Sequence, residues 1–184
     1  MKFVLLTGYA GSGKDTVGSI FQNYGFKRYA VADMLKYYSS EKHGFPFGLT
    51  QTQEGKSSLF NSKSVRQYLI EDAALKKQEH NDPAYWIKPL VELIISEGIE
   101  NVVITDWRYN AEITHIQESF PHAEIVTVRI VRGSVVPLVD ESEHELDNYS
   151  VDFTIQNNGS IDDLNKALIT IVKIRSLQKI ETRS

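Results

Sequence analysis

The residues most able to do chemistry gather in a glycine-rich stretch near the start of the chain. Residues 8–16 read Gly-Tyr-Ala-Gly-Ser-Gly-Lys-Asp-Thr, which has the spacing G-x-x-x-x-G-K of a phosphate-binding loop. Its glycines permit the backbone angles at which successive N–H groups turn inward toward an anion. An apolar run at 3–6 precedes the stretch and a helix predicted at 14–23 follows it, so a bound phosphate would face the positive end of that helix. The residues predicted to bind phosphate are Gly8, Gly11, Ser12, Gly13, Lys14, Asp15 and Thr16.

Lys14 and Asp15 decide how this stretch is interpreted. The structural alternative is a glycine turn between a strand and a helix, with Lys14 in solvent. Asp15 stands where such loops commonly carry Ser or Thr, and a carboxylate beside a triphosphate is repelled unless a cation lies between them. Mg²⁺ that keeps several waters would resolve this, with the hydroxyl of Thr16 as a ligand. Asp15 could instead simply favour the positive end of the predicted helix.

A second candidate pair follows the apolar run 102–104. In open α/β sheets the ligand crevice lies at the carboxyl ends of the strands, so Asp106 and Arg108 are expected near the glycine-rich loop. Asp106 could hold Mg²⁺ through water, and Arg108 could grip an acceptor phosphate with its planar fork. The alternative makes Asp106 the N-cap of a helix near 109–119 and leaves Arg108 on the surface.

Two arginines flank the end of the apolar run 125–131. Arg129 and Arg132 enter the polar segment 132–148, which is predicted to act as a lid over a nucleotide. An arginine on a closing lid stabilises charge on a transferring phosphoryl group and helps to exclude water. Two solvated arginines at a strand end are the alternative.

The region 39–100 is predicted to bind the acceptor. Arg66 stands on a predicted helix before Tyr85 and Trp86, and an aromatic side chain near an arginine could stack a base while the arginine binds its phosphate. Aromatic residues on helices are more often core residues. Asp33 could contact a sugar or amine, or could be the N-cap of residues 34–39.

The order of the predicted elements indicates an α/β fold. The expected strands are 3–6, 29–32, 102–104, 125–131 and 151–155, and the expected helices are 14–23, 64–78, 84–97 and one that begins after Gly159 with Ser160 as its cap. Strands that alternate with helices predict a five-stranded parallel sheet with helices on both faces. Residues 39–63 show no clear period and are predicted to form a long surface loop.

Composition narrows the class of protein. The chain has 184 residues, 41% of them hydrophobic, which suits one soluble domain over residues 1–184. No apolar run reaches the ~20 residues of a membrane span, and we expect no export, because Met1 and Lys2 lead directly into the first apolar run. The absence of cysteine fits a reducing compartment, so the cytoplasm is expected, or the host cytoplasm if the protein is viral. A net charge of −4 with scattered cations argues against binding to nucleic acid polymers.

The histidines show no spacing typical of a metal site. We expect them to be surface residues: His43, His80, His115, His122 and His144. A homodimer is compatible with the sequence.

Several motifs together resemble a known family. They are "GYAGSGKDT" at 8–16, "VVITDWRYNAE" at 102–112, "VRQYLI" at 65–70, "DPAYW" at 82–86, "SE" at 142–143 and "DFTIQNNGSIDDL" at 152–164. The chain resembles the deoxynucleoside monophosphate kinases of the phage and viral type, within the nucleoside monophosphate kinase branch of the P-loop proteins. The resemblance implies ATP and Mg²⁺ as cofactors and transfer of the γ-phosphoryl group to a deoxynucleoside monophosphate. The family has a histidine where this chain has Asp140.

The resemblance also implies roles for particular residues. Residues 8–16 would bind the ATP phosphates, with Lys14 following the migrating charge, Asp15 near Mg²⁺ or the acceptor phosphate, and Arg132 acting from the lid. The predicted catalytic residues are Lys14, Asp15, Arg108 and Arg132. The other predicted contacts to the nucleotide are Arg129 and Asn157. The resemblance implies that Arg66, Arg108 and Glu112 face the acceptor, and the further residues predicted to bind it are Asp33, Trp86 and Asp106.

Two other functions remain open. Phosphomevalonate kinase of the animal type also resembles this loop, including its G-K-D, and would change only the acceptor. A GTPase-like switch is the alternative from another class, but the chain lacks N-K-x-D, and Asp106 is followed by Trp-Arg-Tyr rather than by a glycine at D-x-x-G.

Overall fold

A computed structural model of the chain describes residues 1–136, 144–169 and 171. The chain forms two compact units. The first comprises Met1–Arg28, Asn101–Arg108 and Ala123–Ser184, and the second comprises Tyr29–Glu100 and Tyr109–His122. No helix in the described ranges is both long enough and apolar enough to span a bilayer.

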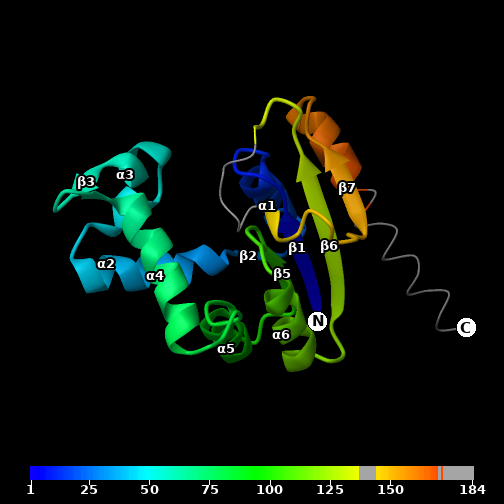
Figure 1. Cartoon of the computed structure of the whole chain (residues 1–184). Helices are drawn as coiled ribbons and strands as arrows, with labels where there is room; N and C mark the ends of the chain where they lie inside the picture. The colour runs from blue at the N-terminus through cyan, green and yellow to red at the C-terminus, as the bar shows by residue number, and fades with distance from the viewer. Residues whose placement is uncertain (137–143, 170, 172–184) are drawn as a thin grey trace, which may run out of the picture. The chain divides into compact units, whose positions relative to one another are not determined.

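A five-stranded sheet organises the first unit (Figure 1). Its strand order is β2-β5-β1-β6-β7, formed by β2 (Lys27–Tyr29), β5 (Asn101–Ile104), β1 (Lys2–Thr7), β6 (Glu124–Val131) and β7 (Phe153–Gln156). β1 pairs in parallel with both β5 and β6, and β6 pairs in parallel with β7. This arrangement confirms the predicted five-stranded parallel α/β fold.

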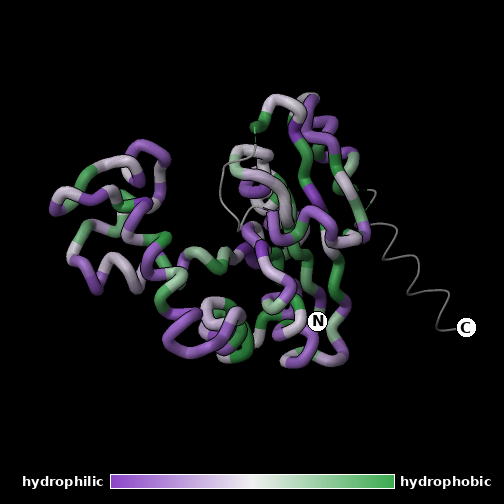
Figure 2. The backbone as a smooth tube through the Cα atoms, in the orientation of Figure 1, coloured by the Kyte–Doolittle hydropathy of each residue, from purple (hydrophilic) through white to green (hydrophobic). Residues whose placement is uncertain are grey.

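Both faces of the sheet are buried. Figure 2 shows hydrophobic stretches along the strands of the sheet. Val4 and Leu6 pack on one face with Val17, Phe21 and Leu168, which lie on α1 (Lys14–Gln22) and on the helix at 161–169. Phe3, Leu5, Val102 and Ile104 alternate with these positions and are 0–1% exposed, as expected of strands covered on both sides.

The last helix begins where the sequence predicted. The Ser160 hydroxyl accepts a hydrogen bond from the Asp163 N–H at 3.2 Å, and the Asp163 carboxylate accepts one from the Ser160 N–H at 3.1 Å. These reciprocal bonds satisfy two backbone donors at the helix start. Leu164, Leu168 and Ile171 reach the core, whereas Val172 and Leu177 of the same predicted stripe lie outside the described residues.

The second unit is mostly helical. It contains α2 (Val31–His43), η1 (Phe47–Thr50), α3 (Gln53–Ser57), α4 (Val65–Glu79), α5 (Ile87–Glu97), α6 (Asn110–Ser119) and a hairpin of β3 (Leu59–Phe60) and β4 (Lys63–Ser64). α2 contacts α4, and α5 contacts α6.

Residues 39–63 are not the long surface loop that the sequence predicted. They contain the end of α2, η1, α3 and the hairpin, and they bury Phe45 and Thr50 at 2% and 0% exposed. Short elements of this kind have no helical or strand period to detect. Local signals fix them instead: the Thr52 hydroxyl caps α3 by accepting from the Gly55 N–H at 3.0 Å, and Asn61 and Ser62 turn the hairpin with positive φ.

Three predicted boundaries in this part of the chain are wrong. The strand expected at 29–32 ends at Tyr29, and α2 begins at Val31 with Ala30 as its N-cap. Asp33 is therefore in the first turn rather than at the cap. The helix expected at 84–97 begins at Ile87, because Asp82 accepts from the Ala84 N–H at 3.0 Å in a turn that precedes the helix.

Candidate functional site

The glycine-rich loop adopts the geometry that its composition predicts. Gly8, Gly11 and Gly13 have φ of 136°, 82° and 101°, a region that other residues rarely enter. Gly13 is the N-cap of α1, so the first N–H groups of that helix open directly onto the loop. A Cβ on Gly8 would collide with the carbonyl oxygen of Ile130 on β6. The loop is thus a concave donor surface at the positive end of a helix, a form suited to phosphate.

Lys14 folds back over this loop. Its ammonium group donates to the carbonyl oxygens of Gly8 and Tyr9, the latter at 3.0 Å. These two bonds position the ammonium group over the loop.

Ser12 and Asn157 brace the second half of the loop. The Asn157 amide donates to the Ser12 carbonyl at 2.8 Å, and a Cβ on Gly13 would collide with that amide. The Ser12 hydroxyl is 1% exposed and has no hydrogen-bond partner among the described residues. Because a buried hydroxyl without a partner is costly, Ser12 is a donor available to a ligand. Asn157 has a defined role in holding the loop, and its contact with a nucleotide stays a prediction.

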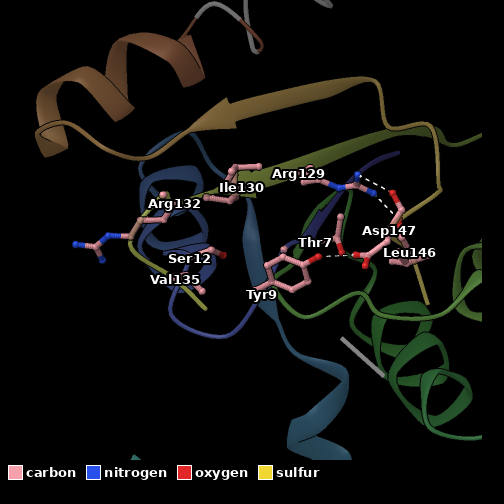
Figure 3. Close-up of a pocket in the computed structure, with 12 residues that line it drawn as sticks. Thr7, Tyr9, Ser12, Arg129, Ile130, Arg132, Val135, Leu146 and Asp147 are labelled. Atoms are coloured by element: carbon pink, nitrogen blue, oxygen red, sulfur yellow. Dashed lines mark hydrogen bonds between the residues drawn. The ribbon is translucent and has the colours of Figure 1, made fainter. Parts of the chain in front are cut away.

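A pocket of about 470 Å³ adjoins the loop (Figure 3). All of its lining residues belong to the first unit: Thr7, Gly8, Tyr9, Ser12, Arg129, Ile130, Val131, Arg132, Gly133, Val135, Leu146 and Asp147. The pocket therefore joins the loop, the end of β6 and the residues on either side of the undescribed segment 137–143. The middle of the predicted lid, residues 137–143 with Asp140, Ser142 and Glu143, lies outside the described residues.

The two arginines expected on the lid, Arg129 and Arg132, differ in their contacts. Arg129 lies on β6, opposite Thr7 of β1 in the register. Its guanidinium donates to the carbonyl oxygens of Leu146, Asp147 and Tyr149, the last two at 3.2 Å, so it clamps backbone rather than extending toward solvent. Arg132 is exposed, and Figure 3 shows its guanidinium pointing away from Tyr9 and Asp147. Of the two, Arg132 is the one with an exposed side chain, and its role as a lid arginine stays a prediction.

Asp147 collects donors at the rim of the pocket. The Tyr9 hydroxyl donates to one carboxylate oxygen at 3.0 Å, and His144 Nδ1 lies 2.8 Å from the other. Burial opposes ionisation of Asp147, but the hydrogen bonds from His144 and Tyr9 and the charges of His144 and Arg129 outweigh it and lower its pKa. The carboxylate is thus held ionised at neutral pH. We call Tyr9, Arg129, His144 and Asp147 the Asp147 cluster.

Asp15 has a partner that the sequence did not indicate. The Arg28 guanidinium lies 2.6 Å from a carboxylate oxygen of Asp15, whose side chain is 83% exposed. This ion pair answers the question of how a carboxylate is tolerated beside the phosphate loop: its charge is balanced by an arginine and turned toward solvent. The predicted catalytic and cofactor contacts of Asp15 stay predictions.

Asp106 and Arg108 follow β5, which is the parallel neighbour of β1. The Trp107 N–H donates to the Leu6 carbonyl at 3.1 Å, so the segment leaves the same edge of the sheet as the glycine-rich loop, as predicted. Asp106 is not a helix N-cap, because α6 begins at Asn110 with Tyr109 as its N-cap.

The donor set fits magnesium. Thr16 is an exposed hydroxyl in the first turn of α1, and Asp106 is a half-buried carboxylate. Both are hard oxygen ligands, and Mg²⁺ in nucleotide sites needs only one or two from the protein because phosphates and waters supply the rest.

The remaining predicted acceptor residues lie in the second unit. Arg66 donates to the Gln53 amide oxygen at 2.5 Å, and Asp33 lies 2.6 Å from the Lys36 ammonium. Glu112 is 4% exposed and accepts from the Tyr109 N–H at 3.1 Å, so it caps the start of α6. Their contacts with an acceptor stay predictions.

Trp86 is a core residue, which corrects the predicted base contact. Its side chain is 6% exposed, and its indole N–H donates to the Ala73 carbonyl at 3.3 Å. Its ring meets the rings of Tyr38 and Tyr85 edge to face. No face of the indole is left for a base, so the core alternative holds.

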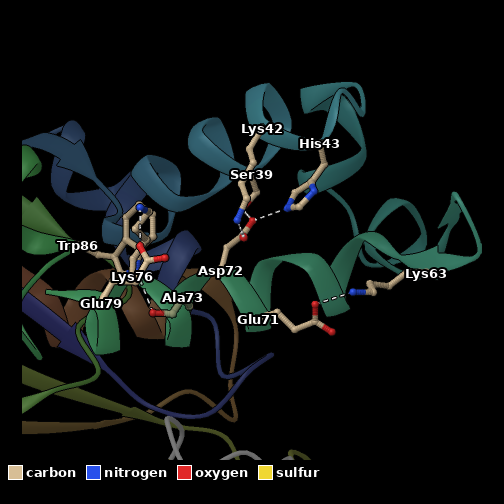
Figure 4. Close-up of polar contacts among 10 residues, drawn as sticks. All are labelled: Ser39, Lys42, His43, Lys63, Glu71, Asp72, Ala73, Lys76, Glu79 and Trp86. Carbon is tan, nitrogen blue, oxygen red and sulfur yellow. Dashed lines mark hydrogen bonds and ion pairs between the residues drawn. The ribbon is translucent and has the colours of Figure 1, made fainter. Parts of the chain in front are cut away.

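A buried carboxylate organises the second unit (Figure 4). Asp72 on α4 is 2% exposed and accepts from the Ser39 hydroxyl at 2.7 Å and the Lys42 ammonium at 2.6 Å, with His43 Nε2 at 2.9 Å. Burial raises its pKa, but hydrogen bonds from Lys42, Ser39 and His43 reverse the shift, so the pKa is lowered. We call these four residues the Asp72 cluster. His43 also lies against Tyr68, with ring centroids 4.3 Å apart, so it is not the plain surface residue predicted.

The sequence did not single out Tyr9, Arg28, His144 or Asp147. Tyr9 occupies a variable position of the loop motif, and a large side chain there is the one signal that could have been used. His144 and Asp147 are three residues apart, a spacing that places them together on one helical turn.

The fold matches those of several solved structures, two of which are named as kinases. Dephospho-CoA kinase from Campylobacter jejuni superposes with a TM-score of 0.51 at 15% identity, covering 97% of this chain and 100% of that one. A gluconokinase from Sinorhizobium meliloti 1021 gives 0.50 at 12% identity, covering 98% and 97%, and TT1252 from Thermus thermophilus gives 0.51 at 16% identity, covering 94% and 96%. At such identities the likeness establishes the P-loop kinase fold. No family model matches the chain, and no curated protein matches its sequence.

Proposed function

We propose that the protein is a kinase that transfers the γ-phosphoryl group of ATP to a deoxynucleoside monophosphate. The observation that carries the proposal is the glycine-rich loop at the N-terminus of α1, with Lys14 held over it and a pocket of about 470 Å³ beside it. This is a site for a polyphosphate rather than for a neutral ligand, because backbone donors, a helix dipole and a lysine converge on one place.

Phosphoryl transfer asks the protein for position and charge rather than for covalent chemistry. The loop and Lys14 would hold the β- and γ-phosphates, and Arg132 would approach the transferring group from the pocket rim. Mg²⁺ bound near Thr16 and Asp106 would neutralise developing charge. Since the acceptor phosphate is already an anion, no strong general base is required, and Asp15 is not assigned as one.

Different observations support the two parts of the proposal, that the protein is a kinase and that its acceptor is a deoxynucleoside monophosphate. The whole-length likeness to a dephospho-CoA kinase and a gluconokinase supports a small-molecule kinase over a GTPase-like switch. The acceptor rests on the sequence motifs that resemble the deoxynucleoside monophosphate kinases. Arg66, Arg108 and Glu112 are the residues that would bind it.

An acceptor panel tests the proposal. Release of ADP from Mg-ATP is followed with deoxynucleoside monophosphates, ribonucleoside monophosphates and phosphomevalonate in parallel. We expect turnover with one or more deoxynucleoside monophosphates, and a loss of at least about 100-fold in kcat/KM for Lys14→Ala because a preorganised cation is removed from the transferring charge. Lys27→Ala is the matched control, because Lys27 is an exposed lysine of β2 in the same unit.

Turnover with phosphomevalonate alone would support a kinase but contradict the proposed acceptor. No ADP release with any monophosphate would contradict the proposed function.

A further inference from the structure

The carbonyl group of Tyr9 is a junction within the glycine-rich loop. It accepts the Ser12 N–H at 3.1 Å, which closes the turn of the loop, and it also accepts the Lys14 ammonium at 3.0 Å. The orientation of this one peptide therefore affects both the curvature of the loop and the position of its lysine.

The side chain of Tyr9 ties this peptide to a different part of the chain. Its hydroxyl donates to Asp147 at 3.0 Å, across 138 positions of sequence. The Tyr9 ring also meets the His144 ring at a centroid separation of 5.6 Å, and His144 bonds the second oxygen of the same carboxylate. Figure 3 shows the Tyr9 hydroxyl directed toward Asp147 within the pocket. An ionised acceptor makes this a charge-assisted bond, stronger than a neutral one.

The backbone at Asp147 is bound by a residue of the sheet. Arg129 donates to the carbonyl oxygens of Leu146, Asp147 and Tyr149, and Arg129 is in register with Thr7, the residue that precedes Gly8. The loop is therefore held at two places. Its start continues from β1, which pairs with β6, and its Tyr9 side chain binds Asp147, whose backbone is bound by Arg129 of β6. Two points of attachment restrict the conformations of the loop more than its connection to β1 alone would.

We propose that Tyr9 is a positioning residue for phosphate binding, which sets the glycine-rich loop and Lys14 by holding Asp147. The proposal rests on the proposed function only in requiring that the loop binds a polyphosphate. Tyr9 need not touch the nucleotide, and its effect is transmitted through its own carbonyl group. The ligand class is a magnesium-bound polyphosphate chain, whatever base is attached to it.

Equilibrium binding of two probes tests the proposal without any acceptor. Mg-ATP and magnesium tripolyphosphate are titrated into the wild-type protein, Tyr9→Phe, Asp147→Ala and the double variant. Loss of one charge-assisted bond is expected to raise the Kd of both probes by about ten-fold in Tyr9→Phe. The two probes should weaken by the same factor, because the loop binds the phosphates that they share. Tyr24→Phe is the matched control and should change neither Kd, since Tyr24 lies beyond the end of α1 and does not line the pocket.

The double variant separates positioning from general stability. If Tyr9 acts through Asp147, Tyr9→Phe adds little to the Kd of Asp147→Ala, because one contact cannot be lost twice. Asp147→Asn, which keeps an oxygen acceptor for Tyr9, should recover part of the affinity. The midpoint of thermal unfolding without ligand should move by less than about 2 °C in Tyr9→Phe.

Unchanged affinities in Tyr9→Phe would overturn the proposal, as would independent, multiplying losses in the double variant. Failure of the proposed function would look different, because the wild-type protein would then bind Mg-ATP and phosphorylate no acceptor.

Discussion

Asp72 in the second unit and Asp147 in the first each bind a histidine and further hydrogen-bond donors, but the two carboxylates differ in burial. The Asp72 side chain is 3% exposed, whereas that of Asp147 is 41% exposed at the rim of the pocket. Both carboxylates have a lowered pKa because their donors outweigh burial. Burial distinguishes the two: the enclosed carboxylate joins two packed helices, and the accessible one holds the side chain of Tyr9 in the glycine-rich loop.

The partners of the two carboxylates support this distinction. Asp72 joins α2 to α4 through Ser39, Lys42 and His43, all within the helical unit. Asp147 joins a turn to a glycine-rich loop through Tyr9. Removing a buried charge leaves its partners without compensation, whereas water can replace Asp147.

The largest expected effect is that of Asp72→Ala on stability. We expect a loss of about 3 kcal/mol in the free energy of unfolding, at the lower end for a broken buried ion pair because Lys42 can still reach solvent. Asp147→Ala should lose less than about 1 kcal/mol. Chemical denaturation followed by tryptophan fluorescence measures both, since Trp86 reports on the second unit and Trp107 on the first.

Trp107→Phe and Trp86→Phe backgrounds isolate the two signals. Equal losses in Asp72→Ala and Asp147→Ala would remove the distinction between the clusters.

The next effect is the dependence of stability on pH. The folded pKa of Asp72 lies below its unfolded value, so its contribution is fully present above the unfolded pKa of about 4 and is lost as the pH falls through the folded value. Between about pH 5 and pH 3 the wild-type protein should lose about 1 kcal/mol more than Asp72→Asn. Lys42 and His43 are the charged or titratable partners of Asp72. Parallel curves for the two proteins from the Trp86 signal would show that Asp72 does not carry this dependence.

The smallest effect is expected at the most exposed carboxylate. Asp15 and Arg28 form an ion pair in which the Asp15 side chain is 83% exposed. Arg28→Ala should change the unfolding free energy by no more than about 0.5 kcal/mol, and less at high salt. Thermal melts at two ionic strengths measure this. A loss comparable to that of Asp72→Ala would mean that burial does not rank the three carboxylates.

The sequence predicts correctly those features that depend on residues close together in the chain. The glycines at 8, 11 and 13, the strand before them and the Ser160 cap depend on neighbours within a few positions, so their patterns are visible in the chain. The edge of the sheet that carries Asp106 followed from the rule that parallel strands end together. The fold class depends on the same local alternation.

The contacts that the sequence did not predict are distant pairs or short elements. Tyr9 and Asp147 are 138 positions apart, and His43 and Asp72 are 29 apart, so no periodicity joins them. For Trp86 the sequence leaves both a base contact and a core position open, because an aromatic residue near an arginine looks the same whether it stacks on a ligand or packs on Tyr38 and Tyr85. The sequence of residues 39–63 predicts a loop because elements of two to five residues have no detectable period.

Transfer of label from ATP tests the central claim most directly. The protein is incubated with Mg-ATP labelled in the γ-phosphate and with each deoxynucleoside monophosphate, and the products are separated. The account predicts label in a deoxynucleoside diphosphate, and its loss in Lys14→Ala. Label that remains in ATP, or that appears only as inorganic phosphate with every monophosphate, would contradict it.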